Sequence, residues 1–211
     1  MKTKLLTLCL TCGAITAWAQ GVVQFRTYYA GTTPAIDARV FGPDRVTPLD
    51  NSNPLWRAAL IGGPTTGTPA NPWAGVMGNL SMMYNPTITT LTWSNFRAPP
   101  NAGYVSNLNV NRAVPGVDWG GTALVQMVAW QGNYNTWAEA YTAGFSGTPN
   151  VLLGVSNPLI LTLPSSSQSP LLTYLWGLDS FYISCGPCPE PGAFAFAALA
   201  AAALFLSRRP N

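Results

Sequence analysis

Short apolar runs with a period of two residues, separated by turns rich in Gly and Pro, dominate the middle of this 211-residue chain. Val23 and Phe25 alternate with polar neighbours, and Leu159, Leu161 and Leu163 do the same. Because successive side chains of a strand point to opposite faces of a sheet, this period indicates half-buried strands. The 20 Gly and 19 Pro suit the many turns that such strands need. The pattern therefore favours an all-β fold.

One run is apolar on both faces and predicts a central strand. It is residues 123–130, ALVQMVAW. Residues 104–111 and 181–183 also alternate and predict further strands. Residues 87–93 are rich in β-branched side chains, but their apolar positions are out of phase, which predicts a bulged strand.

One short helix is predicted after the central strand. Thr136 and Glu139 have the spacing of a capping box, Trp137 and Tyr141 would stack one turn apart, and Gly144 would end the helix. Everything else favours a single antiparallel β-sandwich of about 8–10 strands.

Charged residues are scarce, at 8% of the chain against about 25% in an ordinary soluble domain. Four of the ten cationic residues lie at the extreme ends of the chain, and histidine is absent. The others are scattered arginines, whereas nucleic-acid binding needs a concentrated basic face. We therefore expect no nucleic-acid partner. The six scattered arginines are Arg26, Arg39, Arg45, Arg57, Arg97 and Arg112.

The N-terminus has the three-part layout of a secretory signal peptide. Lys2 and Lys4 precede an apolar stretch, and the stretch ends in the small residues Ala17 and Ala19. We therefore predict a signal peptide over residues 1–19, with cleavage before Gln20.

The C-terminus carries a second apolar segment, residues 192–206, with no polar side chain. As a helix it would span about 22 Å, which is shorter than the ~30 Å hydrocarbon core of a bilayer. Arg208 and Arg209, in the basic tail 207–211, would halt translocation.

Directly before this segment stand Pro189, Glu190 and Pro191. The tripeptide, the apolar helix and the terminal Arg-Arg together resemble the PEP-CTERM sorting signal of exported bacterial proteins. The resemblance implies an exosortase-type processing enzyme that recognises the tripeptide, removes the tail, and releases the body or attaches it at the cell surface. Cys188 departs from the family, which usually has a small aliphatic residue there. The alternative is a plain tail anchor that keeps the protein in the inner membrane.

The body is similar to an uncharacterised group of PEP-CTERM proteins from Verrucomicrobia-like bacteria. The shared segments are WRAALIGGP, AGYV, VQMVAW and GLDSFYI, and they bring no known activity. The expected organisation has five parts in order. They are the signal peptide 1–19, a β-sandwich domain 20–184, a stalk with the sorting motif 185–191, the helix 192–206 and the tail 207–211.

Cys185 and Cys188 bracket Gly-Pro, as in the thioredoxin active site. That chemistry needs the first cysteine at a helix N-terminus, and the prolines that follow Cys188 prevent a regular helix. We therefore favour a short disulfide formed in an oxidising compartment over an oxidoreductase. An effect of the Cys188 thiol on sorting is a third interpretation.

Catalytic motifs are missing from the sequence. Without histidine, no Ser/His or Cys/His dyad can form, and a zinc site would lack imidazole. A pair of carboxylates could still serve a secreted hydrolase, and a calcium site of Asp and backbone carbonyls stays open. We predict no enzyme, no catalytic residue, no metal and no cofactor.

Tryptophan offers the best candidate binding residues. Trp73, Trp93 and Trp119 lie near turns, where exposed rings could stack on sugars, whereas Trp130 belongs to the core. We expect an exported protein of unknown molecular activity, anchored transiently in the inner membrane and then located at the cell surface or in the extracellular matrix. The alternative is a module that binds extracellular polysaccharide.

Overall fold

The computed structural model describes residues 20–30, 35–88, 90, 92–106, 110–149, 151–165 and 173–185. Within these ranges the chain is all-β, with one α-helix and one short 3₁₀ helix. The predicted signal peptide, Cys188, the motif Pro189–Pro191, the apolar segment 192–206, and Arg208 and Arg209 lie outside the described residues.

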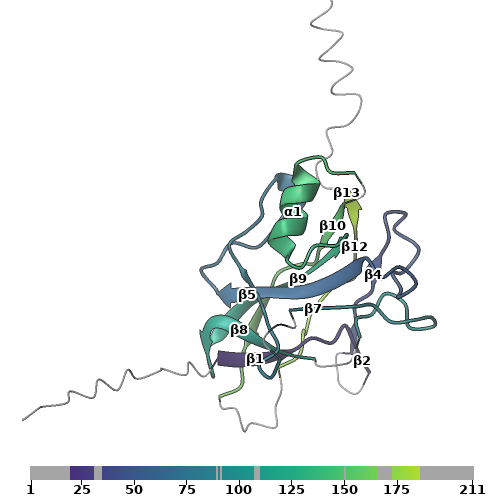
Figure 1. The fold of residues 1–211 in the computed structure, drawn as a ribbon. Coiled ribbons are helices and arrows are strands. Elements are labelled where there is room, and N and C mark those ends of the chain that lie inside the picture. The colour runs from purple at the N-terminus through teal and green to yellow at the C-terminus, as the bar shows by residue number, and fades with distance from the viewer. Residues whose placement is uncertain are drawn as a thin grey trace, which may run out of the picture.

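The largest sheet is antiparallel and has seven strands. Its long strands β5 and β9 pair along their whole lengths, from Trp56 opposite Gln131 to Pro64 opposite Ala123. Figure 1 shows β5 crossing the middle of the molecule, with α1 on one side and β1 and β8 on the other. The order is β13 (Ser184–Cys185), β10 (Leu152–Val155), β9 (Thr122–Gln131), β5 (Trp56–Pro64) and β6 (Ser81–Met82); β11 (Leu159–Thr162) also pairs with β9, and β7 (Trp93–Ser94) with β5.

Three two-stranded ribbons complete the described strands. Two are antiparallel: β1 (Gln20–Gln24) with β8 (Asn111–Asp118), and β2 (Tyr28–Tyr29) with β3 (Ile36–Asp37). The third, β4 (Val40–Phe41) with β12 (Phe181–Tyr182), is parallel. It departs from the expected antiparallel pattern, and it joins segments that are about 140 residues apart in the sequence.

Strands in the described residues are more numerous and shorter than predicted. There are thirteen, and seven of them have two residues each. Such short strands depend on pairing with distant segments, so a local period of two cannot reveal them. The predicted strand at 87–93 is wrong in its first part, where the Asn85 side chain accepts hydrogen bonds from the amides of Thr87 and Ile88 and folds a turn. Of the strand predicted over 104–111, residues 107–109 lie outside the described residues, and the described strand β8 begins at Asn111.

The central strand is confirmed as β9, and alternate residues of β5 and β9 face two separate cores. Leu60, Val125 and Met127 pack against the ribbons, together with Val23, Val40 and Val114. Ile61, Val128 and Trp130 lie on the opposite face, under α1. Since burying one such side chain contributes roughly 1.5–3 kcal/mol, these two cores provide most of the stability.

The helix α1 (Trp137–Phe145) forms with the predicted cap. The Thr136 hydroxyl accepts from the Glu139 amide, and the Glu139 carboxylate accepts from the Asn135 amide. The predicted end at Gly144 is wrong by one residue. Gly144 has a packing role instead, because a Cβ there would lie 3.0 Å from Cδ1 of Leu153 on β10.

Candidate ligand-binding surface

The three candidate tryptophans belong to three different elements. Trp73 lies in the 3₁₀ helix η1 (Pro72–Ala74) and is 42% exposed. Trp93 on β7 is half-buried, with the guanidinium of Arg57 4.3 Å from its ring centroid. Trp119, in the turn between β8 and β9, is also half-buried. Of the three, Trp73 offers the most accessible ring.

A closed loop holds Trp73 in place. Asn71 and Val76 exchange two backbone hydrogen bonds, and the Asn71 side chain accepts from the amide of Ala74. Gly75 adopts the left-handed region at φ 70°, where glycine is favoured, and closes the helix. Since Pro72 is buried, the loop turns Trp73 outward from a fixed base.

Tyr182 and Arg45 lie beside Trp73. The rings of Trp73 and Tyr182 are stacked, with centroids 6.3 Å apart and an interplanar angle of 21°. The Arg45 guanidinium carbon lies 4.3 Å from the centroid of the Tyr182 ring. The parallel pair β4 and β12 makes this possible, because Tyr182 stands opposite Phe41 and the turn that carries Arg45 follows β4 directly.

The turn after β4 is tightly bonded. The Arg45 amide donates to the Gly42 carbonyl over 3.0 Å, as in a turn with proline in its second position. One carboxylate oxygen of Asp44 accepts from the amides of Val46 and Thr47 over 3.1 and 3.0 Å. Hydrogen bonds from Thr47 and Val46 hold the pKa of Asp44 below its ordinary value.

The same turn borders a hollow of about 380 Å³ that contains two carboxylates, Asp44 and Asp50, and the half-buried ring of Trp56. Asp50 also bonds within its own loop, where its carboxylate accepts from the Ser52 amide over 3.0 Å. Trp56 was not among the tryptophans that the sequence singled out. Its exposure could not be predicted from the sequence, because Trp56 is the first residue of the apolar strand β5 and therefore resembles a core residue.

Five of the six scattered arginines have their guanidinium group over an aromatic ring. Such contacts hold a cation through the negative face of the ring. Arg112 is 1% exposed, and burial lowers its pKa to about 10. Sequence reasoning missed this use of arginine because four of the five pairs join segments that are distant in the sequence. The pairs are Arg26 with Tyr29, Arg39 with Tyr104, Arg45 with Tyr182, Arg57 with Trp93, and Arg112 with Phe25.

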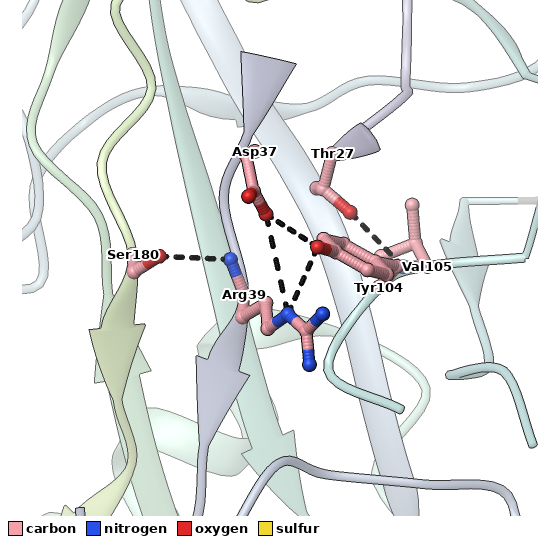
Figure 2. Close-up of polar contacts among 6 residues, drawn as sticks. All are labelled: Thr27, Asp37, Arg39, Tyr104, Val105 and Ser180. Carbon is pink, nitrogen blue, oxygen red and sulfur yellow. Dashed lines mark hydrogen bonds and ion pairs between the residues drawn. The ribbon is translucent and has the colours of Figure 1, made fainter. Parts of the chain in front are cut away.

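Figure 2 shows a polar cluster in which Tyr104 lies between Asp37 and Arg39. The Tyr104 hydroxyl donates to the Asp37 carboxylate and accepts from Nε of Arg39 over 2.8 Å. The Arg39 amide donates to Oγ of Ser180 over 2.9 Å, and Oγ1 of Thr27 accepts from the Val105 amide. Burial, and then the bond to Asp37, raise the pKa of Tyr104. The cluster ties four segments together, so its geometry is that of a structural contact.

The remaining predicted sites are only partly described. Cys185 ends β13 with an exposed thiol, and its proposed partner Cys188 lies outside the described residues, as does the sorting motif. Among the described residues, no group of three or more His, Cys, Asp or Glu could hold a metal ion. No helix in the described ranges has the length and apolar character needed to cross a bilayer.

Comparisons with protein-family models, with curated proteins and with solved structures find no match for this chain.

Proposed function

We propose that the chain is an exported cell-surface or extracellular-matrix protein with a PEP-CTERM-like C-terminal sorting signal. One observation carries the proposal. Pro189, Glu190 and Pro191, the apolar segment 192–206 and a terminal Arg-Arg follow one another in a chain whose N-terminus has the layout of a secretory signal peptide. The partners are then an exosortase-type processing enzyme and, before processing, the membrane. After processing the body is located at the cell surface or outside the cell.

The position of the folded body supports this organisation. Every described strand lies within residues 20–185, between the predicted cleavage site and the sorting motif. Cleavage before Gln20 and beyond Pro191 would therefore leave every described strand intact. We propose that residues 20–184 act as a single β-sandwich domain.

Asp44, one of the two carboxylates of the hollow, does not have the pKa that a general acid needs. A general acid of a hydrolase needs a carboxyl group whose pKa is raised toward neutrality. The pKa of Asp44 is lowered instead, by the hydrogen bonds of its own turn. Such a carboxylate stays ionised and held in its loop. Independently of Asp44, the second candidate function is carbohydrate binding, which the exposed ring of Trp73 beside Tyr182 favours.

Intact mass and cellular location in the native host test the sorting proposal. We expect the unchanged chain to lack the segment 192–211 and to leave the inner membrane. Glu190→Ala should abolish this processing, because it removes the charge at the centre of the motif. Asp179→Ala is the matched control, since it removes one exposed carboxylate from the body and should be processed normally.

A full-length tail retained in the inner membrane by the unchanged chain would contradict the proposal and favour a plain anchor. Normal processing of Glu190→Ala would exclude the tripeptide as the recognised element.

A further inference from the structure

Tyr182 connects an exposed aromatic ring to a cation, because its own ring is stacked with Trp73 and contacts the guanidinium of Arg45. Trp73 is exposed and Tyr182 half-buried, and Arg45 extends from the exposed turn after β4. The three residues come from η1, from β12 and from the turn 42–47, so the fold itself assembles them. Further exposed apolar side chains lie near η1: Met77 follows in the same segment, and Phe145 lies 3.5 Å from the position of a Cβ on Gly75.

The backbone of Arg45 is held in a conformation that arginine rarely adopts. Its φ is 62°, and among the described residues no other non-glycine residue has a positive φ. Glycine or asparagine would fit this position without strain. Residues kept in such regions against their preference cluster at functional sites. Here the conformation directs the side chain onto Tyr182.

The charge of Arg45 is not matched within the described part of the protein. No carboxylate there lies within ion-pair distance of its guanidinium; the described ion pair joins Arg39 and Asp37. The neighbouring Asp44 carboxylate bonds to Val46 and Thr47 of its own turn. A guanidinium that lies over a ring keeps its N–H donors in its own plane, where they can reach an acceptor from outside.

These features define a ligand with an apolar face and an anionic group. The ring of Trp73 suits the apolar face of a sugar. The planar guanidinium of Arg45 suits a carboxylate, to which arginine can donate two parallel hydrogen bonds. A nucleic acid fits poorly, because one cation cannot neutralise a run of phosphates. The chemistry therefore matches a polysaccharide that contains acidic sugars.

We infer that Trp73, Tyr182 and Arg45 form a binding surface for an acidic polysaccharide, with a sugar ring stacked on Trp73 and a sugar carboxylate bound by Arg45. The inference rests on the second candidate function, carbohydrate binding by the body. It is independent of how the C-terminal segment is processed.

Affinity electrophoresis tests the inference, with the protein purified from its native host and run in gels with and without polysaccharide. Polygalacturonate is the acidic probe and dextran the neutral one. We expect retardation by polygalacturonate that weakens as salt rises, because a charge pair exposed to solvent is screened. Trp73→Ala and Arg45→Gly should each weaken binding about tenfold, the effect of losing one exposed stacking or ionic contact. Arg45→Lys should restore only part of it, because lysine lacks the planar fork.

Two controls separate binding from folding. Arg45→Gly removes the guanidinium but suits the positive φ, so its thermal unfolding midpoint should stay close to that of the unchanged protein. Arg97→Ala removes the same charge from another loop and should bind normally. The fold should tolerate this change, because Arg97 donates to the Tyr104 carbonyl through its backbone amide.

Each remaining outcome contradicts a different statement. If dextran retards the protein, and retards Arg45→Gly equally, carbohydrate binding would stand and the specificity for acidic sugars would be overturned. Retardation by neither probe would overturn the inference and weaken the second candidate function. Equal loss in Arg97→Ala would reveal a general charge effect and overturn the assignment to Arg45.

Discussion

Tyr104 makes two polar contacts through its single hydroxyl group. It donates to Asp37, accepts from Arg39 and is 2% exposed. Both partners are charged at neutral pH, and hydrogen bonds to charged groups contribute about 1.5–3 kcal/mol each to stability, less where the partner is exposed. Tyr104 therefore holds β3 and the segment before β8 together through a single atom.

Tyr104→Phe should lower the free energy of unfolding by about 1–2 kcal/mol at neutral pH. The change should also alter how the free energy of unfolding decreases at alkaline pH. Because the pKa of Tyr104 is raised above 10.0 in the folded protein, the unfolded chain loses this proton first, and stability falls as pH rises past that value. The variant should therefore lose less stability than the unchanged protein as the pH rises above about 10.

Urea unfolding at several pH values measures both effects. The control is Tyr28→Phe, the same change on an exposed ring whose centroid lies 4.9 Å from that of Tyr104. Its free energy of unfolding should stay within about 0.5 kcal/mol of that of the unchanged protein. An equal decrease at alkaline pH for Tyr104→Phe and the unchanged chain would contradict the role assigned to the hydroxyl. Tyr141 and Tyr174, whose pKa values are also raised, keep part of the alkaline loss in every variant.

At the scale of elements, Gln126 connects three segments on the helix-covered face of the main sheet. Its Nε2 donates to the carbonyls of Ala70 and Ser156 over 3.0 and 2.8 Å, and its Oε1 accepts from the Ala70 amide over 2.9 Å. β10 and β11 both pair with β9, and their registers on β9 differ by one residue, which is a β-bulge. Ser156 lies between the two strands, and its Oγ accepts the hydrogen bond of the Met127 amide that a strand carbonyl would otherwise accept. The side chain of Gln126 therefore fixes both the bulge and the loop that leads to Trp73.

Gln126→Leu should lower the free energy of unfolding by about 2–4 kcal/mol, because it leaves buried backbone groups of Ala70 and Ser156 without partners. Gln131→Leu, the same change at the half-buried end of β9, is the matched control and should cost less than about 1 kcal/mol. Chemical denaturation of both variants checks this. A loss in Gln126→Leu no larger than in the control would show that the clamp is dispensable.

Local patterns predicted some of these elements and could not predict others. Strand β9 and the cap of α1 were predictable, because an apolar run and a Thr-x-x-Glu spacing act within one segment. The ribbon of β4 and β12 was not, since its two-residue strands exist only through pairing across the domain. Trp73 could be predicted from the sequence as an exposed ring, because it lies near a turn with proline. Arg45 and Tyr182 could not, because only that ribbon brings them together.

At the scale of the whole molecule, the scarcity of charge decides how the protein responds to salt. The body has no lysine or histidine, and five of its six arginines lie over aromatic rings. The ion pair between Arg39 and Asp37 is long, at 4.0 Å, and both side chains are exposed to solvent. Exposed pairs of this kind contribute little to stability, whereas contacts over ring faces are short-ranged and partly shielded from ions.

We therefore expect the free energy of unfolding to change by less than about 0.5 kcal/mol between about 0.05 and 0.5 M sodium chloride at neutral pH. Urea unfolding at the two salt concentrations measures this, with sodium chloride chosen because sulfate would strengthen burial by itself. A large loss of stability with salt would contradict the small contribution assigned to exposed charge pairs. Since binding of polygalacturonate should weaken over the same range, a stable fold with salt-sensitive binding would assign the effect of salt to the ligand contact at Arg45.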